Sequence, residues 1–141
     1  MPFRLRYLTM SKPSAVPQSR NTYKIEPDQW TEFLAQFTRD YRGAHARLEV
    51  LGPEVGYQVE TENKPFDGIS ADTKDGEHAV WIIFGSTSDN HLTHGIHDAV
   101  TIWVRDSTAQ AGPAVEVEGR DGIRTVLELT RPEVFALPPS S

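Results

Sequence analysis

Apolar residues recur at helical spacing in one stretch near the start of the chain. Between Pro27 and Arg42 the large apolar side chains fall at positions i, i+3, i+4, i+7 and i+11, and they are Trp30, Phe33, Leu34, Phe37 and Tyr41. Pro27 suits the first position of a helix, and Gly43 suits the left-handed residue that follows one. The pattern predicts one amphipathic helix over about residues 27–42, whose aromatic stripe must pack on another apolar surface.

After this stretch the apolar period changes from helical to alternating. Valine, leucine and tyrosine alternate with other residues over 47–50, 55–59 and 115–118, which is typical of strands with one buried face. Asp75-Gly76 and Asp121-Gly122 favour tight turns with positive φ at both central residues. We therefore expect two antiparallel hairpins, which join residues 67–73 with 77–84 and residues 114–119 with 123–130. Further breaks are expected at residues 52–53, 63–65 and 111–113.

Two of the predicted strands are apolar on both faces. Residues 80–84 place Val80, Ile82 and Phe84 on one face and Trp81 and Ile83 on the other, and residues 100–104 carry Trp103 opposite three apolar residues. Each side of such a strand requires cover. The sequence predicts an α+β domain, in which one N-terminal amphipathic helix caps the outside of a curved, mainly antiparallel sheet or open barrel of six to eight strands.

Charge divides the chain into unlike parts. Residues 1–20 hold four basic residues and no acid, a charge of +4, while residues 21–141 hold 10 basic and 20 acidic residues, a charge of -10. Proline and serine are frequent at both ends of the chain. We expect a flexible basic arm over 1–21, a single domain over 22–132 and a frayed C-terminal tail over 133–141.

The composition also limits where the protein can be located and which partners it can bind. Residues 1–10 lack the uninterrupted apolar stretch of a secretory signal, and the longest apolar run, residues 79–84, has six residues where a membrane helix needs roughly 20. An acidic body repels phosphate groups. We therefore expect a soluble cytoplasmic protein that binds neither a membrane nor nucleic acid.

Three histidines and an aspartate form the densest group of chemically capable residues: His91, His94, His97 and Asp98. The chain has no cysteine, so a zinc, iron or manganese ion would have to be held by such imidazoles and carboxylates. On a strand, which the neighbouring sequence favours, His91 and His97 share a face and His94 points away. A site there needs donors from other segments, with Asp72, Glu77 and His78 as candidates.

Two other interpretations of the histidine cluster stay open. Its side chains can satisfy backbone groups around an irregular connection between strands. They can also form a histidine-based ligand site or a pH-sensitive surface.

Trp81 and Trp103 are the candidate ligand-binding residues. If the predicted helix does not cover them, they form an aromatic patch with Ile83 that binds a ligand or a partner protein. The alternative is that the helix aromatics pack on both tryptophans.

Five segments together carry a family resemblance: QWTEFL at 29–34, YRG at 41–43, LEVLGPEVG at 48–56, GISAD at 68–72 and HLTHGIHD at 91–98. They resemble a bacterial family known as domain of unknown function 5335, over about residues 24–130. The resemblance implies a bacterial origin and a single compact domain. It supplies no activity, cofactor or catalytic residue.

No catalytic motif meets its spacing requirement. The segment at 68–72 has aspartate where a nucleophile elbow has glycine, and no phosphate-binding glycine loop occurs. We therefore expect a small, soluble, non-catalytic binding or interaction module, with no cofactor and an unidentified protein or small molecule as its partner. The alternative is a metal-binding protein or metal-dependent enzyme that holds a divalent transition metal at the His/Asp cluster. A third hypothesis is a homo-oligomer in which the basic arm of one copy lies on the acidic body of the next.

Overall fold

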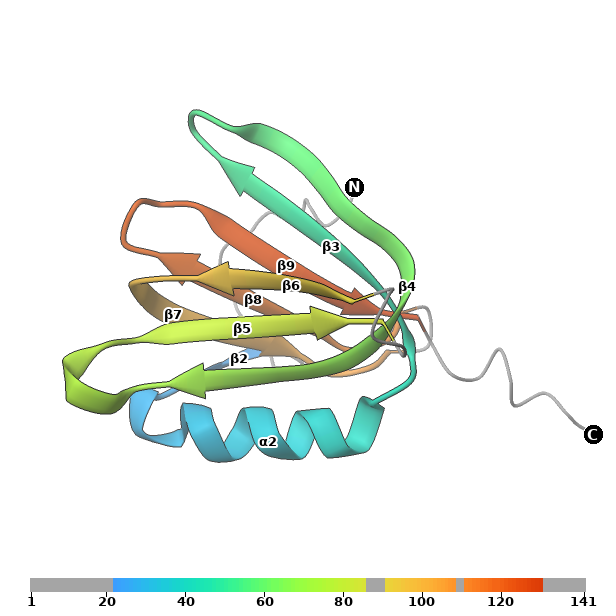
Figure 1. The fold of residues 1–141 in the computed structure, drawn as a ribbon, viewed down its shortest axis with the longest axis horizontal. Coiled ribbons are helices and arrows are strands. Elements are labelled where there is room, and N and C mark those ends of the chain that lie inside the picture. Colours follow the sequence, from blue (N-terminus) through green and yellow to red (C-terminus); the bar gives the residue numbers. More distant parts are fainter. Residues whose placement is uncertain (1–21, 86–90, 109–110, 131–141) are drawn as a thin grey trace, which may run out of the picture.

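Eight strands form one antiparallel sheet in the computed structural model, which describes residues 22–85, 91–108 and 111–130 (Figure 1). The strands are β2 (Thr22–Ile25), β3 (His45–Gly52), β4 (Gly56–Asp72), β5 (Ala79–Phe84), β6 (Leu92–Ile96), β7 (Ala99–Arg105), β8 (Ala114–Gly119) and β9 (Arg124–Leu129). Their order in the sheet is β2-β7-β8-β9-β3-β4-β5-β6, so the sheet is open and β2 and β6 are its edges. Helix α2 (Trp30–Tyr41) follows a short 3-10 turn (Pro27–Gln29).

The predicted fold class is confirmed: one N-terminal helix packs on an open antiparallel sheet of eight strands. Both predicted hairpins are present, as the β4–β5 and β8–β9 pairs. The first hairpin has positive φ at both Asp75 (56°) and Gly76 (77°), within a short 3-10 turn (Lys74–Gly76). In the second, Gly122 has a φ of 83° and Asp121 has no positive φ, so the two-residue turn predicted there is wrong. The predicted arm and tail lie outside the described residues.

Strand β4 bends because it contains extra residues that its neighbours do not match. Its register with β3 shifts twice, and its register with β5 shifts between Phe66 and Gly68. One of the extra residues, Asn63, has a φ of 68°. Such bulges bend a strand and increase its twist. The break expected at residues 63–65 is therefore a bend within one strand and not the end of a strand.

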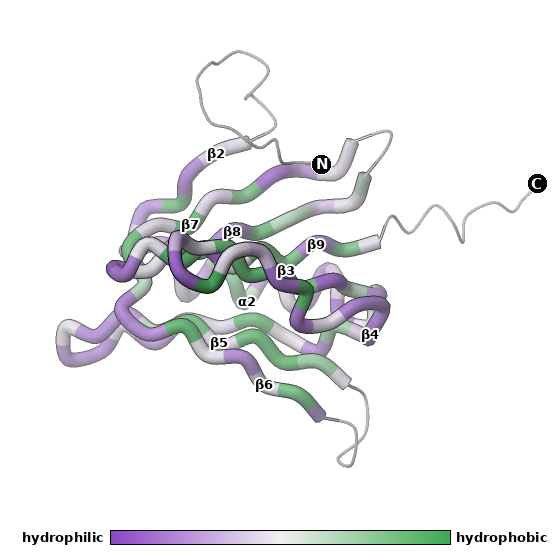
Figure 2. Tube along the Cα trace, turned by 90° about the horizontal axis from the view of Figure 1, so that it is seen from above, coloured by the Kyte–Doolittle hydropathy of each residue, from purple (hydrophilic) through white to green (hydrophobic). Residues whose placement is uncertain are grey.

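The bend folds the sheet into two layers. The first half of β4 pairs with β3 up to Pro65, and the second half pairs with β5 from Phe66 onward. Viewed from above in Figure 2, β2, β7, β8 and β9 lie on one side and β5 and β6 on the other. The faces that meet share one apolar core, which includes Val80, Ile82 and Phe84 from one layer and Ile102, Val115 and Leu127 from the other.

Helix α2 closes the side of this core where β4 has left β3 (Figure 1). The hydroxyl of Thr38 accepts a hydrogen bond from the N–H of Ile69 and donates one to its carbonyl oxygen, both at 2.9 Å. Just beyond the helix, the N–H of Gly43 donates to the carbonyl of Phe66 (2.7 Å), and the N–H of Phe66 donates to the carbonyl of Ala44 (2.7 Å). The backbone of β4 that β3 leaves unpaired is thus satisfied by the helix and its C-terminal turn.

The apolar stripe of α2 enters the core and does not cap an outer face. Trp30, Leu34 and Phe37 belong to the same buried cluster as the inner faces of both layers. At the N-terminal end of the helix, the indole N–H of Trp30 donates a hydrogen bond to the carbonyl of Ile25 (2.9 Å), which connects α2 to β2. The expectation that the helix covers the outside of the sheet is wrong, because the fold of β4 opens a gap between the layers that the stripe fills.

Replacing Thr38 tests this closure. Thr38→Val keeps the shape of the side chain but leaves two backbone groups of Ile69 without their partner, so we expect a loss of about 1–3 kcal/mol in the free energy of unfolding. Thr38→Ser keeps the hydroxyl and should lose less than about 1 kcal/mol. Urea unfolding measures both. Equal losses in the two variants would show that the hydroxyl does not hold α2 on β4.

Candidate functional site

Trp81 and Trp103 lie on the outer faces of different layers. Trp81 in β5 stands between buried Val80 and Ile82, and Trp103 in β7 stands between two residues that are also buried. Both indoles therefore point away from the core. Since β5 and β7 belong to opposite layers, the structure does not bring the two tryptophans into one patch with Ile83. The helix aromatics do not cover them either, because Trp30 and Phe37 lie in the core.

Trp81 is covered by its own neighbours in the second layer. It pairs with Gly95 across the β5–β6 ladder, and its indole occupies the space above that glycine. A Cβ atom added at Gly95 would lie 2.8 Å from Cε3 of Trp81, and closer still to Cζ3. The ring of His97 meets the indole edge to face, with centroids 5.3 Å apart. These contacts make Trp81 a packing residue between β5 and β6.

The three clustered histidines have three different surroundings. His94 pairs with Ile82 and so lies on the inner face, where burial lowers the pKa of its imidazole and the charge of Glu60 opposes that shift. His91 precedes β6, and its Nε2 lies 3.8 Å from Oδ2 of Asp67. His97 follows β6 and packs on Trp81. Within residues 22–85, 91–108 and 111–130, no three His, Asp or Glu side chains are grouped so that they could hold a metal ion.

The other residues considered for the metal site have roles of their own. His78 packs on Trp30, with ring centroids 5.3 Å apart. The carboxylate of Asp72 accepts a hydrogen bond from the backbone N–H of Lys74 (3.2 Å). Asp98 has a φ of 56°, and its carbonyl accepts the N–H of Arg120 (2.9 Å). Asp98 therefore takes part in the turn between β6 and β7 through its backbone, and the interpretation that the side chains of the cluster satisfy backbone groups stays a prediction.

The outer face of the first layer carries a continuous row of side chains across six strands. Directly paired residues of β2, β7, β8, β9, β3 and β4 form this row, which we call the Trp103 row: Lys24, Trp103, Glu116, Val126, Glu49 and Val59. Trp103 is 40% exposed although it lies in the middle of a strand. The row therefore places an accessible indole beside the carboxyl of Glu116.

Glu116 is a half-buried acid without an ion pair to a base in the described part of the chain. Burial raises the pKa of its carboxyl above the ordinary value, the charge of Arg124 opposes this, and the charge of Glu118 adds to it. Nearby on β7, the hydroxyl oxygen of Thr101 is buried with no hydrogen-bond partner among the described residues. Burying a charged or polar group without a partner is unfavourable. The carboxyl of Glu116 and the hydroxyl of Thr101 are therefore groups that a bound ligand could pair with.

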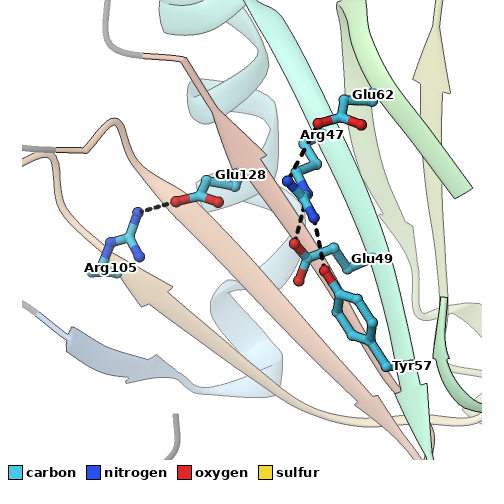
Figure 3. A network of polar contacts seen from close by, with 6 residues as sticks. All are labelled: Arg47, Glu49, Tyr57, Glu62, Arg105 and Glu128. Carbon is cyan, nitrogen blue, oxygen red and sulfur yellow. Dashed lines mark hydrogen bonds and ion pairs between the residues drawn. The ribbon is translucent and has the colours of Figure 1, made fainter. Parts of the chain in front are cut away.

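Two arginines on the neighbouring row of the same face, Arg47 and Arg105, form ion pairs (Figure 3). Nε of Arg47 lies 2.6 Å from Oε2 of Glu49, and its NH2 group donates to the hydroxyl of Tyr57 (2.7 Å). The NH2 group of Arg105 lies 3.2 Å from Oε2 of Glu128. These ion pairs hold charged side chains in place on the outer face on both sides of β9. The carboxyl of Glu116 has no such ion pair among the described residues.

Sequence reasoning found Trp103 and missed Glu116. Glu116 and Glu118 alternate with valines, which is the ordinary pattern of a strand with one solvated face. Only the register of β7 with β8 shows that Glu116 stands opposite Trp103. No signal in the sequence itself indicates this pairing.

This fold defines a small α+β protein with a candidate binding face, and no group of residues that could hold a metal ion occurs in the part of the chain that the structure describes. The chain belongs to the family of unknown function DUF5335, whose family model matches residues 21–139. It is similar to an uncharacterized protein of Aquifex aeolicus (strain VF5), with 29% identity over 108 residues, 77% of this chain and 91% of that protein. No solved structure matches it. The predicted family resemblance is confirmed, and no described helix is long and apolar enough to cross a membrane.

Gly95→Ala tests the packing of Trp81 on β6. The added methyl group would meet the indole, so we expect a loss of about 1–3 kcal/mol in the free energy of unfolding, as for other overpacked sites. In a Trp81→Val background the ring is absent, and the same substitution should cost less than about 1 kcal/mol. Thermal or urea unfolding of the four proteins of this cycle measures the coupling. Additive losses would contradict the contact.

Glu116→Gln tests the cost of the half-buried acid. Because the folded-state pKa of Glu116 is raised, its contribution to stability is complete below the unfolded-state value of about 4.5 and declines as the pH rises through the folded-state pKa. The amide does not titrate. We therefore expect the variant to gain stability relative to the wild type between acidic and neutral pH. Urea unfolding across this range measures the difference, and a difference that does not change with pH would contradict the burial of an ionised Glu116.

Proposed function

We propose that this protein is a small non-catalytic binding module that takes up a basic segment of a partner protein on the outer face of its first layer, at Trp103 and Glu116. One observation carries this proposal. Trp103, which is 40% exposed in mid-strand, stands directly opposite a half-buried carboxyl group that has no ion pair among the described residues, whereas Arg47 and Arg105 on the same face have theirs.

An arginine or lysine side chain fits both groups at once. The face of an indole attracts cations, and Lys24 already places its Nζ 6.0 Å from the ring centroid of Trp103. A guanidinium stacked on the indole can also bind a carboxylate with two parallel hydrogen bonds. Such a partner would form an ion pair with Glu116, and the pKa of Glu116 would fall on binding.

The surrounding surface supports the same partner chemistry. Glu118 lies two residues along β8 on the same outer face and offers a second carboxylate. At the far end of the face, Tyr57 and Val59 are 53% and 40% exposed and supply apolar contact area. Residues 21–141 carry a net charge of -10, which attracts a basic partner over a longer range.

A metal-dependent function has no comparable observation in its favour, because His91, His94 and His97 face different surroundings. Location in the cytoplasm, the absence of a membrane or nucleic-acid partner and assembly through the basic arm stay predictions from composition.

Short peptides test the partner chemistry. In a Trp81→Phe protein, the remaining tryptophans are buried Trp30 and exposed Trp103, so a ligand on the outer face is read from the fluorescence of Trp103. We expect saturable binding of peptides with a central arginine, and binding at least about tenfold weaker for twins with citrulline, which keeps the shape but not the charge. Glu116→Gln should weaken arginine binding by a similar factor.

Val100→Ala serves as the matched control, because Val100 is 46% exposed on the same strand. It should leave peptide binding unchanged. Equal binding of arginine and citrulline peptides, or no saturable change with either at millimolar concentration, would contradict a basic partner at this face.

A further inference from the structure

Among residues 22–85, 91–108 and 111–130, strand β6 is an edge of the sheet without the usual protection. Within these residues it pairs with β5 alone, in a register without a bulge. Its five residues, Leu92–Ile96, include no lysine, arginine, acid or proline. The other edge, β2, is shorter, carries Lys24 and is followed by Pro27. Natural proteins commonly protect edge strands with charges, prolines or bulges, because unpaired backbone groups invite another strand.

The sequence around this edge has the same chemical pattern in both directions. From residue 91 to residue 97 it is His-Leu-Thr-His-Gly-Ile-His, with His94 at the centre. Reversing the segment exchanges histidine with histidine, leucine with isoleucine and threonine with glycine. An antiparallel pair of identical strands centred on His94 therefore joins histidine with histidine and leucine with isoleucine, and places Thr93 opposite the small Gly95.

We propose that two copies of this chain associate through β6, antiparallel about a two-fold axis at His94, so that their sheets become continuous. In this register Leu92 lies opposite Ile96 of the partner subunit, and His91 lies opposite His97 of the partner subunit. Both contacts occur twice, as a two-fold interface requires. The new backbone hydrogen bonds satisfy the edge of each β6.

The two faces of the joined strands suit this pairing. Leu92, His94 and Ile96 pair with Phe84, Ile82 and Val80 of β5, so they extend the inner, apolar face. The seam brings no lysine, arginine or carboxylate of β6 against its own copy. The seam also places His91, His94 and His97 of both chains along the same pair of strands, although within one chain these histidines have different surroundings.

This inference is independent of the proposed function. The seam lies at the edge of the second layer, whereas Trp103 and Glu116 lie on the first layer. Loss of self-association would leave peptide binding at Trp103 unchanged, and loss of peptide binding would leave the dimer intact.

Sedimentation velocity of the full chain tests the edge. We expect a dimer for the wild type and an association at least about tenfold weaker for Thr93→Lys, because Thr93 is exposed on β6 and a charged side chain on an edge strand opposes pairing with another strand. Thr22→Lys makes the same substitution on β2 and should leave the dimer unchanged. Circular dichroism checks that both variants remain folded.

Introduced cysteines test the register in this cysteine-free chain. His91→Cys and His97→Cys are exposed positions, and a mixture of the two proteins should form a disulfide-linked dimer faster than either protein alone. Opposite residues have Cα atoms within disulfide reach, whereas identical residues of the two copies would be roughly 20 Å apart. Val100→Cys, exposed on β7, should cross-link slowly in every mixture.

Three results would overturn the proposal. The first is a monomeric wild type at all concentrations up to the millimolar range. The second is a dimer that persists in Thr93→Lys and is lost on deletion of residues 1–20 or of residues 131–141, since one of those segments would then hold the copies together. The third is cross-linking of His91→Cys or His97→Cys alone at the rate of the mixture.

Discussion

The whole fold depends on one change of partner along strand β4. After Pro65 the strand leaves β3 and continues beside β5, and the backbone it exposes there would be unsatisfied without α2. A single hydroxyl, that of Thr38, serves both backbone groups of Ile69. Because an unpaired buried peptide group is costly, helix and strand stabilise each other at this edge. The two layers can then close on one apolar core.

The same fold decides which surfaces remain available for binding. With the stripe of α2 inside the core, no described helix covers the outer face of either layer. In the second layer Gly95 and His97 pack on Trp81, while in the first layer Trp103 stays accessible beside Glu116. Folding also leaves β6 at the end of the sheet. A binding face and a free edge therefore arise on different layers of the same small domain.

The unfavourable burial of Glu116 is a local destabilisation of the fold that is consistent with a binding role. Burial raises the pKa of its carboxyl, so the ionised side chain opposes folding at neutral pH. Its neighbours on the face, such as Arg47 with Glu49 and Arg105 with Glu128, have partners that offset their desolvation. A basic ligand would do the same for Glu116, and this links the stability of the sheet to its proposed partner.

The sequence by itself determined the helix near residues 27–42, the two hairpins, the fold class and the family, because each depends on local periodicity, turn residues or motif order. Only the tertiary structure decided which residues meet. Alternation separates Trp81 and Trp103 from the other face of their strands, but burial shows which face is outward, and the bend of β4 places the two tryptophans on different layers. Likewise, if the histidines lie on a strand, their spacing predicts that His94 points away from His91 and His97, but not what each one contacts. Neighbours across a sheet are set by strand order and register, and these depend on contacts between segments far apart in the chain.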